Sequence, residues 1–218
     1  MPIRNGPPVS GLFRHAQNIQ KHWEHEMHRT IALVLAGFGL AHTALAEPQN
    51  YTVDMAHSRI FFDVDHRGYS TMLGRFSEFG GEFVFDAENP AASSLDITIN
   101  PASIDMFHEG LNNHLQTADF FNVAEHPELR FVSERVEVTG DNQFKVHGQF
   151  TMLGQTHPLS FDVSLNQTGQ ARGGAPMAGF TATGTLDRTD YGMGYGAPAV
   201  GAEVAFRIEI EASAATTS

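Results

Sequence analysis

The sequence predicts an all-β fold in which about eight antiparallel strands close into a barrel or sandwich, with one helical insertion. Short runs of alternating apolar and polar residues recur almost to the C-terminus, as in half-buried strands. Turn signals such as "DAENPAAS", "TGDNQ" and "LGQTHP" separate these runs at regular intervals. Only residues 104–121 interrupt the alternation, so we expect a single domain with one insertion.

Each predicted strand has an apolar face and a polar face. The polar face carries residues such as Asp96, Lys145 and Glu209, and a further strand is expected over residues 129–134. Because side chains alternate across a strand, the apolar residues of each run share one side, which we expect to face the interior. In chain order these are Ile60, Phe62 and Val64; Phe83 and Phe85; Leu95, Ile97 and Ile99; Phe144, Val146, Gly148 and Phe150; Leu159, Phe161, Val163 and Leu165; Phe180, Ala182, Gly184 and Leu186; and Val204, Phe206, Ile208 and Ile210.

Residues 104–121, "IDMFHEGLNNHLQTADFF", have a helix-like pattern. Phe107, Leu111 and Leu115 recur at intervals of four, which places them on one stripe of a helix, and Ser103 is a plausible N-cap. Phe120 and Phe121 follow directly, next to the predicted strand at 129–134. Such a pair either plugs the end of a core or helps close an apolar pocket.

The first 46 residues resemble a processing segment rather than part of the domain. Arg29 precedes the apolar stretch 31–40, and Ala44-Leu45-Ala46 fits the small-residue pattern of a signal-peptide cleavage site. The apolar run is about half of the roughly 20 residues that a spanning helix needs, so no stable membrane anchor is expected. We predict a leader and signal peptide over 1–46, with Met27 as a candidate translation start, and one barrel domain over 47–218 in the periplasm.

Charge and composition exclude several classes of function. The full chain has a net charge of −12, and residues 47–218 keep nine basic and 23 acidic residues, a net charge of −14. This charge repels phosphate backbones and anionic membrane surfaces, so nucleic acid is not an expected partner. With no cysteine in the chain, disulfides, thiolate metal sites and catalytic thiols are impossible.

Metal binding and catalysis are both disfavoured. The histidines after residue 46 form neither an HExxH motif nor an i, i+4 pair, so we expect no metal and no cofactor. Asp187, Arg188 and Asp190 lie close together, but an ion pair that stabilises a turn explains them better than acid-base catalysis. The chain is therefore predicted not to be an enzyme. An eight-stranded barrel has an interior that side chains can fill or that can hold one small or elongated ligand, and alternation alone leaves both open.

Several motifs, taken in order, resemble the YceI-like family of exported polyisoprenoid-binding proteins. They are "YTVDMAHSRIFFDVDHRGYSTMLGRFSEFGGEFVFD", "SID" with "HLQTADFFNVAEHPELRFVS", "VHGQFTMLGQTHPLSFDV", "GFTATGTLDRTDYGM" and "VGAEVAFRIEIEA". The resemblance spans nearly all of Tyr51 to Ala212. Each motif alone is weakly specific, whereas the ordered set is highly specific.

The resemblance implies an eight-stranded antiparallel lipocalin-like barrel with a short helical insertion after the fourth or fifth strand. It also implies a long-chain lipid or isoprenoid, such as a quinone tail, in an apolar tunnel and a periplasmic location. Members of the family are often dimeric, which makes a homodimer a candidate assembly. The alternative is a filled barrel that acts as a structural or interaction module without a lipid. The expected tunnel lining is Ile60, Phe62, Val64, Phe83, Phe85, Ile97, Ile99, Met106, Leu111, Leu115, Phe120, Phe121, Phe131, Phe150, Phe161, Phe180 and Ala182.

Candidates for contact with the ligand head group at the tunnel mouth are His66, Arg67, Arg75, Asn112 and Arg188. The sequence departs from the family here, because Leu111 and Asn112 stand where the family commonly has an Arg-Asp pair. Met106 likewise replaces a usual threonine and makes the predicted helix entrance more apolar. These departures concern recognition of the head group and barely affect the expectation that an apolar tail is bound.

Overall fold

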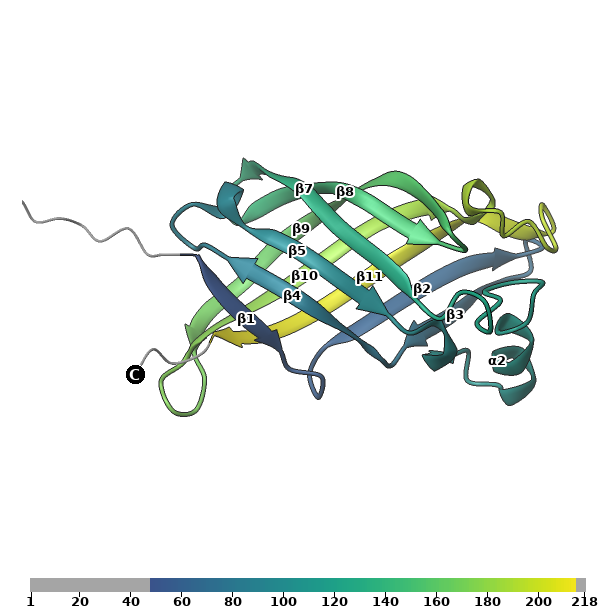
Figure 1. Ribbon diagram of the computed structural model, residues 1–218, viewed down its shortest axis with the longest axis horizontal. Coiled ribbons are helices and arrows are strands. Elements are labelled where there is room, and N and C mark those ends of the chain that lie inside the picture. The colour runs from purple at the N-terminus through teal and green to yellow at the C-terminus, as the bar shows by residue number, and fades with distance from the viewer. Residues whose placement is uncertain (1–47, 215–218) are drawn as a thin grey trace, which may run out of the picture. The chain divides into compact units, whose positions relative to one another are not determined.

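The computed structural model describes residues 48–214, so the predicted signal peptide and its cleavage site lie outside the described part of the chain. Eleven strands form one antiparallel sheet (Figure 1). They are β1 (Gln49–Val53), β2 (Arg59–His66), β3 (Ser70–Phe76), β4 (Phe79–Phe85), β5 (Ser94–Ile99), β6 (Ile104–Asp105), β7 (Leu129–Gly140), β8 (Gln143–Met152), β9 (Gln155–Gln170), β10 (Pro176–Asp187) and β11 (Val200–Ala214). The helices are α2 (Glu109–Leu115) and the 3-10 turns η1 (Pro90–Ala92), η2 (Pro101–Ser103) and η3 (Arg188–Tyr191).

The sheet closes on itself to form a barrel. Neighbouring strands follow the order β1-β4-β5-β7-β8-β9-β10-β11, and β11 pairs back with β1 through residues 212–214. The other part of β11 pairs with β2, which continues to β3 and β6. Closure pairs most of the edges that a flat sheet would expose, whereas β5 and β7 pair only through Asp96–Ile99 and Leu129–Val132.

Several short strands are two parts of one barrel strand. β1 and β2 both pair with β11 and together form one barrel strand. β4 pairs with β1 and β3 pairs with β2, which gives the second barrel strand. β5 pairs with β4 and β6 pairs with β3, which gives the third. Counted in this way the barrel has eight strands, so the predicted fold class is confirmed. The helix α2 follows β5 and the two-residue β6, at the end of the third full barrel strand.

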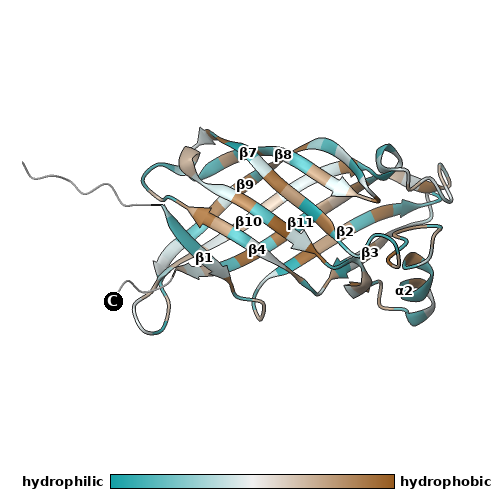
Figure 2. Cartoon of the chain, in the orientation of Figure 1, coloured by the Kyte–Doolittle hydropathy of each residue, from teal (hydrophilic) through white to brown (hydrophobic). Residues whose placement is uncertain are grey.

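Hydropathy follows the expected alternation, with apolar and polar residues exchanging along the strands (Figure 2). Strand β8 shows it most clearly, since buried residues alternate with less buried ones from Phe144 to Met152. Two clusters of buried apolar side chains result. One extends from the barrel interior to the α2 end and contains Phe76, Phe121 and Tyr191; the other, with Tyr51, Phe85 and Phe180, lies on β1, β4, β10 and β11.

The helical insertion is shorter than predicted, and its predicted N-cap is wrong. Helix α2 covers only Glu109–Leu115, and its N-cap is His108, whose side chain accepts a hydrogen bond from the backbone N–H of Leu111. Residues 104–105 instead form β6 against β3. Phe107 adopts a left-handed backbone conformation with φ of 59°, which ends the extended segment before the helix begins.

Candidate functional site: an apolar cavity in the barrel

The barrel encloses a cavity of about 230 Å³. Apart from Gly80 and Ser93 its wall consists of apolar residues, so the interior is not completely filled. An apolar cavity of roughly 150 Å³ is known to stay dry and to admit benzene. The lining residues are Val53, Ile60, Phe62, Phe79, Gly80, Phe83, Phe85, Pro90, Ser93, Leu95, Ile97, Ile99, Phe131, Val136, Phe144, Val146, Phe150, Leu159, Phe161, Val163, Phe180, Ala182, Leu186, Val204, Phe206, Ile208 and Ile210.

Inward-facing glycines leave room for the phenylalanine rings of the wall. A Cβ atom on Gly184 would lie 2.6 Å from Cζ of Phe206, and one on Gly148 would lie 2.6 Å from Cζ of Phe131. The rings of Phe131 and Phe161 pack against each other with centroids 5.0 Å apart, and that of Phe206 lies 5.8 Å from Phe161. These rings are therefore held in place by the backbone on one side and by each other on the other.

Most of the residues predicted to line a tunnel belong to the cavity wall. These are Ile60, Phe62, Phe83, Phe85, Ile97, Ile99, Phe131, Phe150, Phe161, Phe180 and Ala182. The others, Val64, Met106, Leu111, Leu115, Phe120 and Phe121, lie outside the lining. Their inclusion assumed a tunnel that continues to the helix, whereas packed side chains fill the α2 end.

Phe120 and Phe121 belong to this filled end. The ring of Phe121 packs edge-on against Phe76 at 5.7 Å, and Phe76 packs against the lining residue Phe62 at 5.4 Å. Phe121 is buried, while Phe120 packs at the edge of the same cluster. The pair thus plugs the α2 end of the interior and leaves the cavity between this plug and the opposite end of the barrel.

The residues predicted to contact the ligand head group lie outside the cavity lining. Three of them, Arg75, Asn112 and Arg188, form hydrogen bonds within the protein through their side chains. Arg75 donates two hydrogen bonds to Oδ2 of Asp105, at 3.0 and 2.8 Å. The side-chain oxygen of Asn112 accepts from the backbone N–H of Met106 at 2.7 Å, which ties α2 to the preceding segment. His66 ends β2 and Arg67 begins the following turn, and both are exposed.

Arg188 is buried and does not form the ion pair that its sequence neighbours suggested. Only 4% of its surface is exposed, and its guanidinium donates to the backbone carbonyls of Met193, Val200 and Gly201. Asp187 instead accepts from the backbone N–H and the hydroxyl of Thr189, which lowers the pKa of its carboxyl. Burial lowers the pKa of Arg188, opposed by the negative charge of Asp187. Arg188 therefore organises the loop between β10 and β11.

Some residues of the cavity wall were not predicted from the sequence, because irregular backbone places them there. Val136 lines the cavity from the far part of β7, beyond a register shift between Ser133 and Arg135. Pro90 and Ser93 reach the wall from η1 and its flank, in a stretch whose sequence signals only a turn. Regular alternation identifies inward residues only where the ladder is regular, so these positions carried no readable signal.

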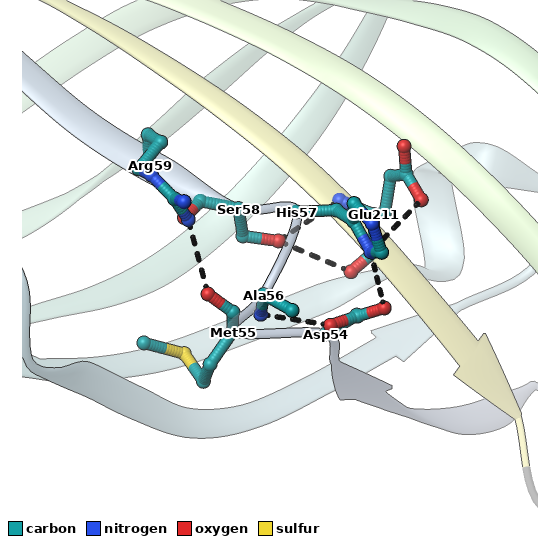
Figure 3. Close-up of polar contacts among 7 residues, drawn as sticks. All are labelled: Asp54, Met55, Ala56, His57, Ser58, Arg59 and Glu211. Carbon is teal, nitrogen blue, oxygen red and sulfur yellow. Dashed lines mark hydrogen bonds and ion pairs between the residues drawn. The ribbon is translucent and has the colours of Figure 1, made fainter.

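The break between β1 and β2 is held by a polar cluster that includes Glu211 of β11 (Figure 3). The backbone N–H of Glu211 donates to Ser58 Oγ at 3.0 Å, and its carbonyl accepts from the N–H of Asp54 at 2.8 Å. Nδ1 of His57 lies 2.8 Å from Oδ2 of Asp54 and 4.0 Å from Oε2 of Glu211. These contacts close the ladder across the break.

The ligand atoms of Asp54, His57 and Glu211 lie within 4.8 Å of one another. The sequence did not reveal this grouping because Glu211 is far from the other two residues in the chain. Asp54 and His57 already hydrogen-bond each other, and this exposed contact accounts for their positions without an ion. The absence of a physiological metal stays a prediction.

The pair formed by Asp54 and His57 is expected to make stability depend on pH. The hydrogen bond to Asp54 raises the pKa of His57 above its ordinary 6.5, and the same bond lowers the pKa of Asp54 below 3.8. The stability that His57 contributes to the folded state is fully present below pH 6.5 and is lost as pH rises through its raised folded-state pKa. The stability that Asp54 contributes is present above pH 3.8 and is lost as pH falls through its lowered folded-state pKa.

Melting temperatures of the native chain and of His57→Gln, measured from pH 3 to 9, test this linkage. The native chain should exceed the variant most between about pH 4 and 6.5, and the difference should shrink on either side. Groups common to both proteins cancel in the comparison. A difference that is constant across the whole range would contradict the assignment.

A closed eight-stranded antiparallel barrel around an apolar cavity is the architecture of lipocalin-like barrels. The family model described as "YceI-like domain" matches residues 51–212. The chain belongs to this family. Similar proteins include a UPF0312 protein of Shewanella sp. strain MR-7, 39% identical over 75% of this chain and 86% of that protein. A UPF0312 protein of Pectobacterium atrosepticum is 36% identical over 75% of this chain and 83% of its own length.

Solved structures show the same fold. The crystal structure of BcnA from Burkholderia cenocepacia superimposes with a TM-score of 0.67 at 24% identity, over 75% of this chain and 99% of that one. A polyisoprenoid binding domain from Saccharophagus degradans superimposes with a TM-score of 0.59 at 12% identity, over 76% of this chain and 98% of that one. In residues 48–214, no helix is long and apolar enough to span a membrane.

Proposed function

We propose that the protein is an exported binding protein that holds the apolar chain of an isoprenoid or related lipid in its barrel for transport, storage or scavenging in the periplasm. The observation that carries the proposal is the cavity of about 230 Å³ with its almost entirely apolar wall. Membership of the YceI-like family and the fold shared with a polyisoprenoid binding domain support it. The signal-peptide pattern before Glu47 supports export.

The cavity limits how much of a chain is held. If roughly 150 Å³ admits the six carbons of benzene, 230 Å³ takes a segment of about nine or ten carbons. Burying such a segment would contribute about 8 kcal/mol to the binding free energy, at ~0.8 kcal/mol per buried methylene, before the cost of ordering the chain is subtracted. A longer tail, including a polyprenyl or quinone tail, would extend from the barrel or displace phenylalanine rings.

We infer binding rather than catalysis. Asp187 and Arg188 are two of the residues whose spacing could suggest acid-base catalysis. The carboxylate of Asp187 accepts a hydrogen bond from Thr189, and the guanidinium of Arg188 donates to backbone carbonyls. The lining contains one hydroxyl, that of Ser93, which accepts a hydrogen bond from the backbone N–H of Asp86 at 3.1 Å. A wall of this kind can shield an apolar chain, and it contains no histidine, carboxylate or lysine that could activate the Ser93 hydroxyl as a nucleophile.

Native extraction tests the proposed function. Protein purified gently from the producing cells should release a long-chain lipid into organic solvent at near-stoichiometric yield, identified by mass spectrometry. The barrel denatured before purification and then refolded provides the empty control. Repeated recovery of empty protein that also ignores added quinones and prenols would instead favour a structural or interaction module.

A further inference from the structure

We propose that the apolar chain enters tail first through a portal between η1 and β7, that its head remains at this portal, and that the portal selects an uncharged head over an anionic one. The inference rests on the proposed function and deepens it, because it assigns the direction of binding and the chemical class of the head. Three features carry it: an interruption in the barrel wall, a sealed opposite end, and the charge around the opening.

The barrel wall lacks a complete ladder between β5 and β7. The two strands pair only through Asp96–Ile99 and Leu129–Val132, and the last hydrogen bond between them runs from the N–H of Leu95 to Ser133 Oγ at 2.8 Å. Strand β7 then continues to Gly140 with β8 on one side. On the other side the neighbouring segment is η1, not a strand (Figure 1). Opening this contact breaks no ladder hydrogen bonds.

Inward-facing side chains are exposed to solvent at this gap. Directly paired residues of antiparallel strands share a face, and Val136 pairs with Val146 and Val138 with Phe144. Val146 and Phe144 line the cavity, yet Val138 on the same face is 53% exposed. An exposed valine on the inner face marks the place where the interior meets solvent. Pro90 and Ser93 complete the lining on the η1 side.

The opposite end of the cavity is sealed. Phe62 and Phe150 line its last part, and behind them lie the buried rings of Phe76 and Tyr191, with centroid distances of 5.4 and 5.5 Å. Phe62 cannot retreat, because its ring tip already occupies the space where a Cβ atom of Gly74 would lie. A chain that enters at η1 therefore meets a wall at its tail, and its head stays near the opening.

Charges around the portal disfavour an anion. Asp141 lies in the turn after β7 and is exposed. The guanidinium of Arg135, on β7, is paired with Glu137 at 2.8 Å. Residues 47–218, with nine basic and 23 acidic residues, add a net charge of −14, so a diphosphate, sulfate or carboxylate head would be repelled, whereas an uncharged hydroxyl, amide or quinone head would not.

Single-tryptophan variants can report the direction of binding. In a Trp23→Phe background, which removes the one native tryptophan, Val138→Trp places an indole at the portal and Phe150→Trp places one at the sealed end. A medium-chain alcohol brominated at the end of its tail should quench Phe150→Trp strongly and Val138→Trp weakly. The isomer brominated beside its hydroxyl should reverse this order. Leu186→Trp replaces Phe150→Trp if that variant fails to fold.

The reverse quenching pattern, or equal quenching at both positions, would overturn the portal even if lipid is bound. The absence of quenching in both variants, together with empty protein in the extraction experiment, would instead overturn the proposed function. For the head group, an alkyl sulfate of matched length should bind about tenfold more weakly than the alcohol at low salt, with a smaller gap at high salt. Equal affinity for sulfate and alcohol at low salt would refute the charge selection.

Discussion

Replacing Arg188 with alanine should lower the free energy of unfolding by about 3–5 kcal/mol, because it removes a buried charged donor group from several backbone acceptors at once. The carbonyls of Val200 and Gly201 accept from the guanidinium at 2.9 and 2.8 Å, and Met193 supplies a third acceptor. With 4% of the side chain exposed, water cannot readily replace these bonds. Urea unfolding monitored by circular dichroism measures the loss.

Arg130→Ala is the matched control. Arg130 forms a two-pronged ion pair with Asp96, at 2.8 and 2.6 Å, but half of its side chain is exposed, so its removal should cost no more than about 1 kcal/mol. Arg188→Lys should lie between the two alanine variants, since an ammonium group cannot reproduce the planar fork of a guanidinium. Equal losses for the two alanine variants would contradict the structural role of Arg188.

The Arg188 variants also distinguish a structural role in the loop between β10 and β11 from recognition of the lipid head group. If Arg188 bound the head group, its mutation would lower lipid affinity while stability remained nearly constant. If Arg188 holds the loop, its mutation lowers stability first. Because Arg188 faces backbone carbonyls rather than the cavity, Arg188→Lys protein that remains folded should retain its lipid. Loss of lipid from a fully stable Arg188→Lys protein would restore Arg188 as a mouth residue.

Sequence reasoning was most successful where structure is local and regular. Alternation identified Phe144, Phe161 and Phe180 as inward residues, because a regular ladder keeps every second side chain on one face. It did not identify β1 as the first part of the barrel strand that β2 continues, since the break between them depends on Ser58 and Asp54 meeting Glu211 across the barrel. Long-range pairing of this kind leaves no periodic trace in the sequence.

In the helical insertion, a local pattern predicted more regular structure than the chain forms. The spacing of Phe107, Leu111 and Leu115 is helical, yet Asp105 bonds to Arg75 on β3 and holds the start of the segment extended. Tertiary contacts thus overrode a pattern that by itself favoured a longer helix. The portal escaped detection for a related reason: the bulge after Ser133 shifts the alternation, so that Val136 and Val138 face inward although the preceding residues predict otherwise.

Replacing Ala182 with tryptophan should abolish lipid binding while changing thermal stability little. Ala182 lines the cavity from β10 and is 8% exposed. In a filled core the larger ring would overpack and cost about 1–3 kcal/mol or more. Here the free volume of about 230 Å³ can receive it, since roughly 150 Å³ already admits a benzene ring. The indole would then occupy the space that we assign to the apolar chain.

Thr183→Trp is the control for Ala182→Trp, because Thr183 is the next residue on β10 and is exposed on the outer face. In a Trp23→Phe background, the Ala182→Trp indole should emit as a buried chromophore in lipid-free protein, and the Thr183→Trp indole should emit as an exposed one in protein that keeps its lipid. Severe destabilisation of Ala182→Trp would show that the interior is effectively filled. A stable Ala182→Trp protein with unchanged lipid content would place the ligand elsewhere than in this cavity, because an indole and a chain segment of about nine carbons together exceed its volume.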